Sequence, residues 1–224
     1  MSALFITGAG TDVGKTFVTA GLIRHLRGRG QAVDALKPIV SGFDPVAPSG
    51  SDPAILLEAL GRSVTDKELA RISPWRFRAP LSPDMAASAE GRTMDPQGVI
   101  RFCQAAITAA DGVLLIEGVG GVMVPLDDRC TTLDVMARLG LPLIFVGGSY
   151  LGAISHILSG IDVLLHRGLE LRAVAISETP ASTVALDATM ATLGHFVKSP
   201  LLALRRHGEA AENEAVFARL AALL

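Results

Sequence analysis

The sequence predicts an α/β fold in which helices cover both faces of a mostly parallel sheet. Short apolar runs alternate along the 224 residues with longer stretches of helical periodicity. Runs such as VLLI and LPLIFV are apolar throughout, which indicates strands buried on both faces. Because half of the residues are hydrophobic, we expect a single domain over residues 1–224 with a sizeable core.

The elements follow in order from the same alternation. Strands are expected at Ala3–Thr7, Ala32–Leu36, Val113–Ile116, Leu141–Val146, Arg172–Ile176 and Pro200–Leu204. Helices are expected at Lys15–Arg29, Pro53–Leu60, Pro96–Ala109, Leu133–Leu139, Ala153–Arg167, Ser182–Phe196 and Glu209–Leu224. Asp95 and Pro96 form a typical N-cap and first helical residue. The segment 41–52, SGFDPVAPSGSD, predicts a long functional loop, because the alternation resumes after it.

Composition excludes several classes of protein. The net charge is −2 and no basic block occurs, so we expect neither a nucleic-acid partner nor a membrane partner. No stretch approaches the ~20 apolar residues of a membrane span, and the first residues lack the basic region of a signal peptide. Cys103 and Cys130 lie outside any metal-binding spacing, and we expect both to be reduced. These features predict a cytoplasmic location.

GAGTDVGKT, residues 8–16, lies between the first predicted strand and the first predicted helix. It follows the spacing G-x5-G-K-T, one residue longer than the common phosphate-binding loop G-x4-G-K-[ST]. Backbone N–H groups at a helix N-terminus bind phosphate, the Lys15 ammonium neutralises its charge, and the Thr16 hydroxyl suits Mg²⁺. The alternative is a chance G-K-T in an ordinary turn. The strand–loop–helix context favours a P-loop NTPase-like nucleotide site.

Two charged residues end strands beside this loop. Glu117 ends a buried strand and precedes Gly118 and Gly120, which let a ligand approach the backbone. Its carboxylate suits Mg²⁺, although a solvated acid at a strand end is the alternative. Lys37 follows the second strand, where a point charge suits a transferring phosphoryl group. For Lys37 the alternative of a surface lysine stays equally open.

Several functional motifs are missing from the chain. The Asn-Lys-x-Asp element of guanine-specific GTPases is absent, since the one asparagine is Asn213. No nucleophile elbow, zinc cluster or G-x-G-x-x-G dinucleotide motif occurs either.

Six segments resemble the dethiobiotin synthetase family in order and spacing. They are GAGTDVGKT, LKPIVSG, Ser51-Asp52, PLSPDMAASAEGR, IEGVGGVMVPL and YLGAISH, and the resemblance spans residues 2–204. The family's loop has the same G-x5-G-K-T spacing. The resemblance implies ring closure of 7,8-diaminononanoate with CO₂ or bicarbonate, using ATP and Mg²⁺, to give dethiobiotin, ADP and phosphate. It also implies a carbamate that is phosphorylated and then attacked by the second amine.

The resemblance also implies roles for residues at matching positions. The implied catalytic residues are Lys37, Lys15 and Thr11. Those implied for the nucleotide are Asp12, Val13, Gly14, Lys15, Thr16, Phe17, Asp52, Glu117, Gly118, Val119, Gly120, Ser177 and Glu178, of which Thr16, Asp52 and Glu117 hold Mg²⁺. Those implied for the substrate are Thr11, Ser41, Pro80, Gly118, Leu151, Gly152 and Ser155. Because the family takes the segment at 151–155 from the neighbouring subunit, a homodimer with sites at its interface is expected.

The chain departs from the family where the nucleobase is held. Ser177-Glu178 stands where the best-known members carry Asn-Asp, and a serine cannot reproduce the two-sided pairing of an amide. The family's Pro-Trp-Leu has no equivalent in LRRHG, residues 204–208.

Two other functions compete with the ligase. One is a switch-type ATPase of the partition class that acts through protein partners, although its signature lysine is replaced by Gly10. The other is a small-molecule kinase, for which no Arg-rich lid is found.

Overall fold

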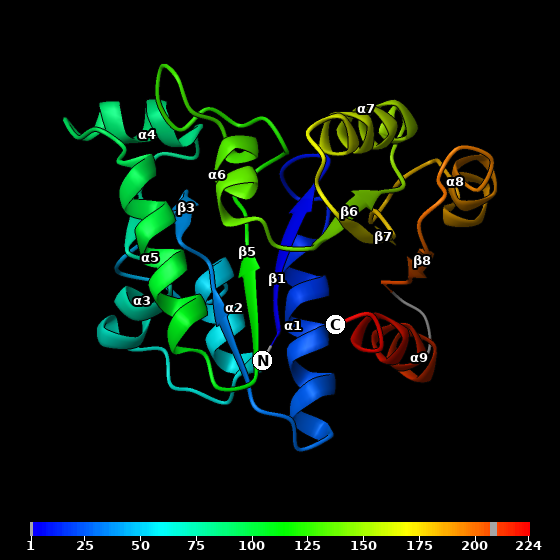
Figure 1. Cartoon of the computed structure of the whole chain (residues 1–224), viewed down its shortest axis with the longest axis horizontal. Coiled ribbons are helices and arrows are strands. Elements are labelled where there is room, and N and C mark those ends of the chain that lie inside the picture. Colours follow the sequence, from blue (N-terminus) through cyan, green and yellow to red (C-terminus); the bar gives the residue numbers. More distant parts are fainter. Residues whose placement is uncertain (1, 207–209) are drawn as a thin grey trace.

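Six parallel strands form the central sheet, in the order β2-β5-β1-β6-β7-β8. The computed structural model describes residues 2–206 and 210–224, and Figure 1 shows this sheet among its helices. The strands are β1 (Ser2–Gly8), β2 (Val33–Leu36), β5 (Val113–Glu117), β6 (Leu143–Gly148), β7 (Leu171–Ser177) and β8 (Leu201–Leu204). The predicted α/β fold with a mostly parallel sheet is confirmed.

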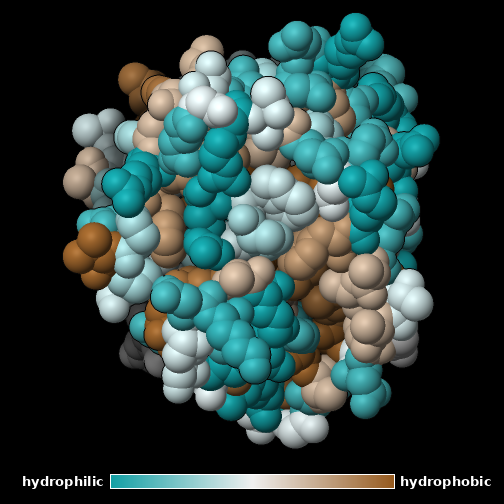
Figure 2. All heavy atoms as spheres, turned by 90° about the vertical axis from the view of Figure 1, so that its left-hand side faces the viewer, coloured by the Kyte–Doolittle hydropathy of each residue, from teal (hydrophilic) through white to brown (hydrophobic). Residues whose placement is uncertain are grey.

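Helices follow most of these strands and cover the sheet. They are α1 (Lys15–Gly28), α2 (Asp52–Ala59), α3 (Asp66–Ile72), α4 (Pro83–Ala89), α5 (Pro96–Ala109), α6 (Thr132–Leu139), α7 (Ala153–His166), α8 (Leu186–Leu193) and α9 (Ala210–Ala221). Helix α1 packs against α2 and α9, and α5 packs against α6. The predicted N-cap is confirmed, because Asp95 accepts a hydrogen bond from the Gly98 N–H at 2.7 Å. The side of the molecule that carries α4 is covered mainly by hydrophilic side chains (Figure 2).

Some elements differ from the prediction. Strands β3 (Ile39–Ser41) and β4 (Trp75–Phe77) form a separate parallel pair, and their three residues each are too few to show a period in the sequence. Helices α3 and α4 are also short and were not predicted. The helix expected at Ser182–Phe196 is shorter and spans Leu186–Leu193, because the Ser182 hydroxyl instead donates to the Ser149 carbonyl and accepts from the Val184 N–H. Glu209, the predicted start of the last helix, lies outside the described residues.

The sheet order places a ligand site at the end of β1. From β1 the chain first builds the side that carries β2 and β5, and then the side that carries β6, β7 and β8. A crevice opens at the carboxyl ends of the strands where this direction reverses. The loop after β1 and the ends of β2 and β5 therefore converge there. Among the described residues, none of the helices is long and apolar enough to span a membrane. The cytoplasmic location stays a prediction.

Candidate active site

The phosphate loop, residues 8–16, connects β1 to the first turn of α1. Gly14 is the N-cap of α1 and has a φ of 98°, a left-handed conformation that suits glycine. A Cβ atom at Gly14 would also lie 2.5 Å from Ser177 Oγ. Lys15 is buried, and its Nζ donates to the Gly10 carbonyl at 2.5 Å, so its side chain curls across the loop. An anion bound at this loop would therefore meet both the N-terminus of a helix and an adjacent ammonium group.

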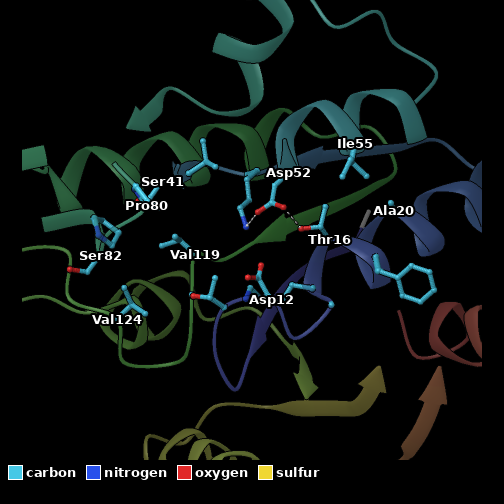
Figure 3. Close-up of a pocket in the computed structure, with 18 of the residues that line it drawn as sticks. Asp12, Thr16, Ala20, Ser41, Asp52, Ile55, Pro80, Ser82, Val119 and Val124 are labelled. Atoms are coloured by element: carbon cyan, nitrogen blue, oxygen red, sulfur yellow. Dashed lines mark hydrogen bonds and ion pairs between the residues drawn. The ribbon is translucent and has the colours of Figure 1, made fainter. Parts of the chain in front are cut away.

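Oxygen atoms from three elements meet at the start of α1. Thr16 Oγ1 lies 2.8 Å from Asp52 Oδ1 and 2.7 Å from Glu117 Oε1. Figure 3 shows the Thr16 and Asp52 side chains pointing toward each other. Asp52 is the first residue of α2 and Glu117 is the last of β5, so the topology joins them from distant parts of the chain. The three residues predicted to hold magnesium are therefore neighbours.

Lys37 lies within this cluster, between β2 and β3. Its Nζ is 2.7 Å from Glu117 Oε1, 2.9 Å from Asp52 Oδ2 and 3.0 Å from the Gly118 carbonyl. Lys37 is only 1% exposed, so the interpretation as a surface lysine is wrong. Burial alone would lower the pKa of Lys37, but the Glu117 and Asp52 carboxylates outweigh burial, and this pKa is raised. Lys37 is therefore a charged ammonium at neutral pH.

The same charges set the protonation of two neighbours. Burial raises the pKa of Asp52, but the Lys37 ammonium and the hydrogen bond from Thr16 outweigh it, and the pKa is lowered overall. Asp52 is thus an ionised carboxylate. Burial, followed by repulsion from Lys37, lowers the pKa of Lys15 from 10.5 to about 8. Lys15 therefore gains more from an added anion than an exposed lysine would.

The oxygen cluster fits a hard divalent cation. The Thr16 hydroxyl carries one proton and can donate to only one of its two carboxylate neighbours at a time. Glu117 Oε2 is buried and has no hydrogen-bond partner among the described residues. No group of three or more His, Cys, Asp or Glu side chains suited to a metal occurs in the described part of the chain. Magnesium needs no such group, because it is typically held by one or two carboxylates together with substrate phosphates and waters.

A cavity of about 840 Å³ extends from the phosphate loop to the segment before α4. Thr11, Ser41, Pro80, Val119 and Gly120 are among the residues that line it. Figure 3 shows Ser41, Pro80, Val119 and Val124 on one side of Asp52, and Ala20 and Ile55 on the other. The cavity thus has a phosphate end and a second end on the side of Ser41.

Unpaired hydroxyls mark the second end as a place for a polar ligand. Ser41 Oγ and Ser82 Oγ are buried there and lack hydrogen-bond partners among the described residues. A buried hydroxyl without a partner is costly, and a bound polar group would relieve that cost. Ser82 was not predicted as a site residue. It occurs in the segment PLSPDMAASAEGR, which was used only for the family resemblance.

Sequence relatives identify the family. Residues 2–205 match the family described as AAA domain. The ATP-dependent dethiobiotin synthetase BioD of Caulobacter vibrioides is 47% identical over 197 residues, which are 88% of each chain. The synthetase of the same name from Methylobacterium nodulans is 45% identical over 213 residues, which are 93% of this chain and 95% of the relative. The chain belongs to the dethiobiotin synthetase family.

Solved structures support the fold of this dethiobiotin synthetase family member. The septum site-determining protein MinD of Pyrococcus horikoshii, in complex with Mg-ADP, superposes with a TM-score of 0.59 at 14% identity. The match covers 98% of this chain and 94% of MinD. The signal recognition particle receptor FtsY of Elizabethkingia anophelis gives a TM-score of 0.52 at 13% identity, over 97% of this chain and 64% of FtsY. At these identities the likeness shows a P-loop NTPase fold alone.

Some residues expected from the dethiobiotin synthetase family do not line this cavity. Leu151, Gly152 and Ser155 lie at the start of α7, outside the cavity lining, where the family expectation assigns them to a neighbouring subunit. Ser177, the last residue of β7, and Glu178, which follows it, also lie outside the lining. Val13, Glu117 and Gly118 are likewise absent from it. Their contacts with nucleotide or substrate stay predictions.

Two arginines of the cavity were also missed by the sequence reasoning. Arg206 lines the cavity after β8, and Arg24 lines it from α1. Arg24 has a signal in the sequence, since Phe17, Ala20 and Arg24 lie on one face of α1 at helical spacing. Arg206 has no such signal, because LRRHG matches no motif with a known mechanism.

Proposed function

We propose that the protein is an ATP-dependent dethiobiotin synthetase. It closes the ureido ring of 7,8-diaminononanoate with CO₂ and ATP, giving dethiobiotin, ADP and phosphate. The observation that carries the proposal is one cavity in a chain of this family. It joins a phosphate loop and the Lys37 ammonium to the Ser41 and Ser82 hydroxyls, which have no partner among the residues that the structure describes. Triphosphate and diamine can thus lie end to end.

The reaction needs three steps in this cavity. One amine of the substrate adds to CO₂ and loses a proton, which gives a carbamate. A carbamate oxygen then attacks the γ-phosphorus of ATP, and ADP leaves. The second amine attacks the carbonyl carbon of the resulting mixed anhydride, the ring closes, and phosphate leaves with the electrons of the broken C–O bond. Because water would hydrolyse the anhydride, the site must also exclude solvent.

The charged residues of the cavity have distinct roles in these steps. Lys15 and the N–H groups of Asp12 to Phe17 hold the triphosphate at the start of α1. Lys37 stabilises the charge on the phosphoryl group as it moves to the carbamate. Thr11 and Ser41 line the same cavity, and we assign them hydrogen bonds to the carbamate and amines. Val119 and Gly120 also line it, and we assign their backbone a position between nucleotide and substrate.

Thr16, Asp52 and Glu117 would hold magnesium. The support is the close set of three oxygens, the ionised Asp52 and the unpaired Glu117 Oε2. When bound there, magnesium neutralises phosphate charge and orients the γ-phosphate. The Lys37 ammonium contacts the same carboxylates, so it holds them together before nucleotide binds.

Exposed apolar side chains support a homodimer. Leu151, just before α7, is 85% exposed, Met85 in α4 is 59% exposed and Met123 is 56% exposed. Figure 1 shows α4 and α7 both along the upper edge of the molecule, α4 toward the left and α7 toward the right. A second copy that covers this edge would bury these side chains and would bring the residue 151–155 segment to its partner's cavity.

Phosphate release that depends on the diamine tests the proposed function. The purified protein is mixed with 7,8-diaminononanoate, bicarbonate, Mg²⁺ and ATP, and phosphate and dethiobiotin are measured. We expect phosphate and dethiobiotin to form in equal amounts. When the diamine is left out, we expect phosphate release to be at least about a hundredfold slower. Hydrolysis of ATP that is indifferent to the diamine would instead favour the switch-type ATPase.

The pH dependence of ATP binding tests the role of Lys15. Without ligand the pKa of Lys15 is about 8, and phosphate oxygens beside the ammonium raise that pKa in the complex. Above pH 8, Lys15 must therefore take up a proton when the nucleotide binds. Well below pH 8, Lys15 is already protonated and binding involves no proton uptake by it. We expect the Kd of Mg-ATP to be roughly tenfold higher at pH 9 than at pH 7. Titration calorimetry measures this, and a Kd that stays flat over this range would contradict the role.

A further inference from the structure

Arg206 lies in the cavity beside the phosphate loop, close to Gly14 and Phe17. A triphosphate held at the start of α1 leaves its nucleoside beside the first turn of that helix and the carboxyl ends of β7 and β8. Phe17 and Arg206 line the cavity there. The carbon of the Arg206 guanidinium lies 4.6 Å from the centre of the Phe17 ring, so the two side chains form a cation–π stack.

The two predicted base-contacting residues hold this stack in place. Arg206 Nε donates to Ser177 Oγ at 3.3 Å, and the Arg206 backbone N–H donates to Glu178 Oε2 at 2.9 Å. Neither terminal nitrogen of Arg206 has a hydrogen-bond partner within residues 2–206 and 210–224. Ser177 and Glu178 therefore support Arg206, which keeps a guanidinium face and donors for a ligand.

Helix α9 supports the same stack from the other side. Asn213 donates from Nδ2 to the Arg205 carbonyl at 2.6 Å and accepts from the Arg205 N–H at 3.0 Å. The Phe217 ring meets Phe17 edge to face, with ring centres 6.3 Å apart. Figure 1 shows α9 beside α1. The C-terminal helix thus fixes both the backbone before Arg206 and the aromatic ring beneath it.

We propose that Arg206, held on Phe17, is the surface on which the nucleobase stacks, and that this contact makes the site tolerant of different bases. Every base has a π face, so stacking on a guanidinium is tolerant of base identity. The guanidinium donates hydrogen bonds but accepts none, so it cannot select adenine by its amino group. Purine N7 and pyrimidine carbonyl oxygens all accept from it. The inference rests on the proposed function only in taking a nucleoside triphosphate as ligand.

Direct binding tests the proposal without the ligase reaction. The magnesium complexes of ATP, GTP, CTP and inorganic tripolyphosphate are titrated into the full chain by calorimetry. We expect the wild-type Kd values for the three nucleotides to agree within about fivefold. In Arg206→Ala we expect nucleotide binding to weaken about tenfold or more, with tripolyphosphate changed less than about threefold. Arg206→Lys keeps the charge without the planar stack, and we expect it to behave like Arg206→Ala.

Arg205→Ala is the matched control, because the Arg205 side chain instead pairs with Asp187 at 2.7 Å. It should leave all four Kd values within about threefold of wild type. A wild-type preference for ATP above about thirtyfold would overturn the proposal. If Arg206→Ala weakened the binding of tripolyphosphate and of the nucleotides by the same factor, the proposal would also be overturned, since Arg206 would then contact phosphate rather than the base. Normal nucleotide binding without diamine-dependent turnover would refute the ligase function and leave this inference standing.

Discussion

Replacing Lys37 with glutamine is expected to lower kcat by about 10³-fold or more and to change the Kd of Mg-ATP less than about threefold. Lys37 is the ammonium among the acids at the junction of the two ends of the cavity, so its charge acts where the phosphoryl group moves. Ground-state nucleotide binding relies on the phosphate loop and Lys15, which this change leaves intact. Single-turnover phosphate release and titration calorimetry measure the two quantities.

The same variant should depend on magnesium for its stability. Without Lys37, the buried Glu117 carboxylate and Asp52 lose their shared counter-ion, a change that costs about 3–5 kcal/mol. For a chain of this size we expect the Tm to fall by roughly 10 °C without Mg²⁺ and to recover partly with it. Lys67→Gln, at an exposed lysine of α3, is the control and should change neither kcat nor Tm. Lost nucleotide binding together with unchanged Tm would contradict the assigned role.

The strands of the fold could be predicted from the sequence where they are buried on both faces, because such strands are apolar throughout. Strands β5 and β6 are continuous apolar runs, and their positions in the sequence are unambiguous. The pair β3 and β4 could not be predicted, because three residues carry no period and the pairing joins segments separated by α2 and α3. The start of α8 could not be predicted either, because it depends on a hydrogen bond from Ser182 to the carbonyl of Ser149, which follows β6.

The candidate site was predictable where its residues are close in sequence. The phosphate loop is contiguous, so Lys15 and Thr16 follow from pattern and helix physics. The ion pair between Lys37 and Glu117 joins residues 80 positions apart, and the resemblance rather than any spacing brought in Asp52. The position of Arg206 in the site could be recognised only from the structure. The proposed function of this arginine depends on Phe17, near the start of the chain, and on Ser177, which lies 29 positions before it.

Replacing Glu117 with glutamine is expected to raise the Mg²⁺ concentration for half-maximal turnover by about tenfold or more. It should also lower kcat at saturating Mg²⁺ by about 10²-fold. The side chain keeps its shape, but the cluster loses one of two carboxylate charges and Lys37 keeps only Asp52 as an ionic partner. Initial rates at fixed ATP over a range of free Mg²⁺ give both quantities.

This change separates a metal-binding acid from one that only positions Lys37. If Glu117 binds Mg²⁺, the half-saturating concentration rises and excess metal restores only part of the rate. If Glu117 only holds Lys37, kcat falls at every Mg²⁺ concentration and the half-saturating value stays where it was. Glu58→Gln, at an exposed carboxylate of α2, should match wild type in both. Glu117 Oε1 already contacts the Thr16 hydroxyl and Lys37, whereas its Oε2 is buried and has no hydrogen-bond partner within the described part of the chain, which favours the first outcome.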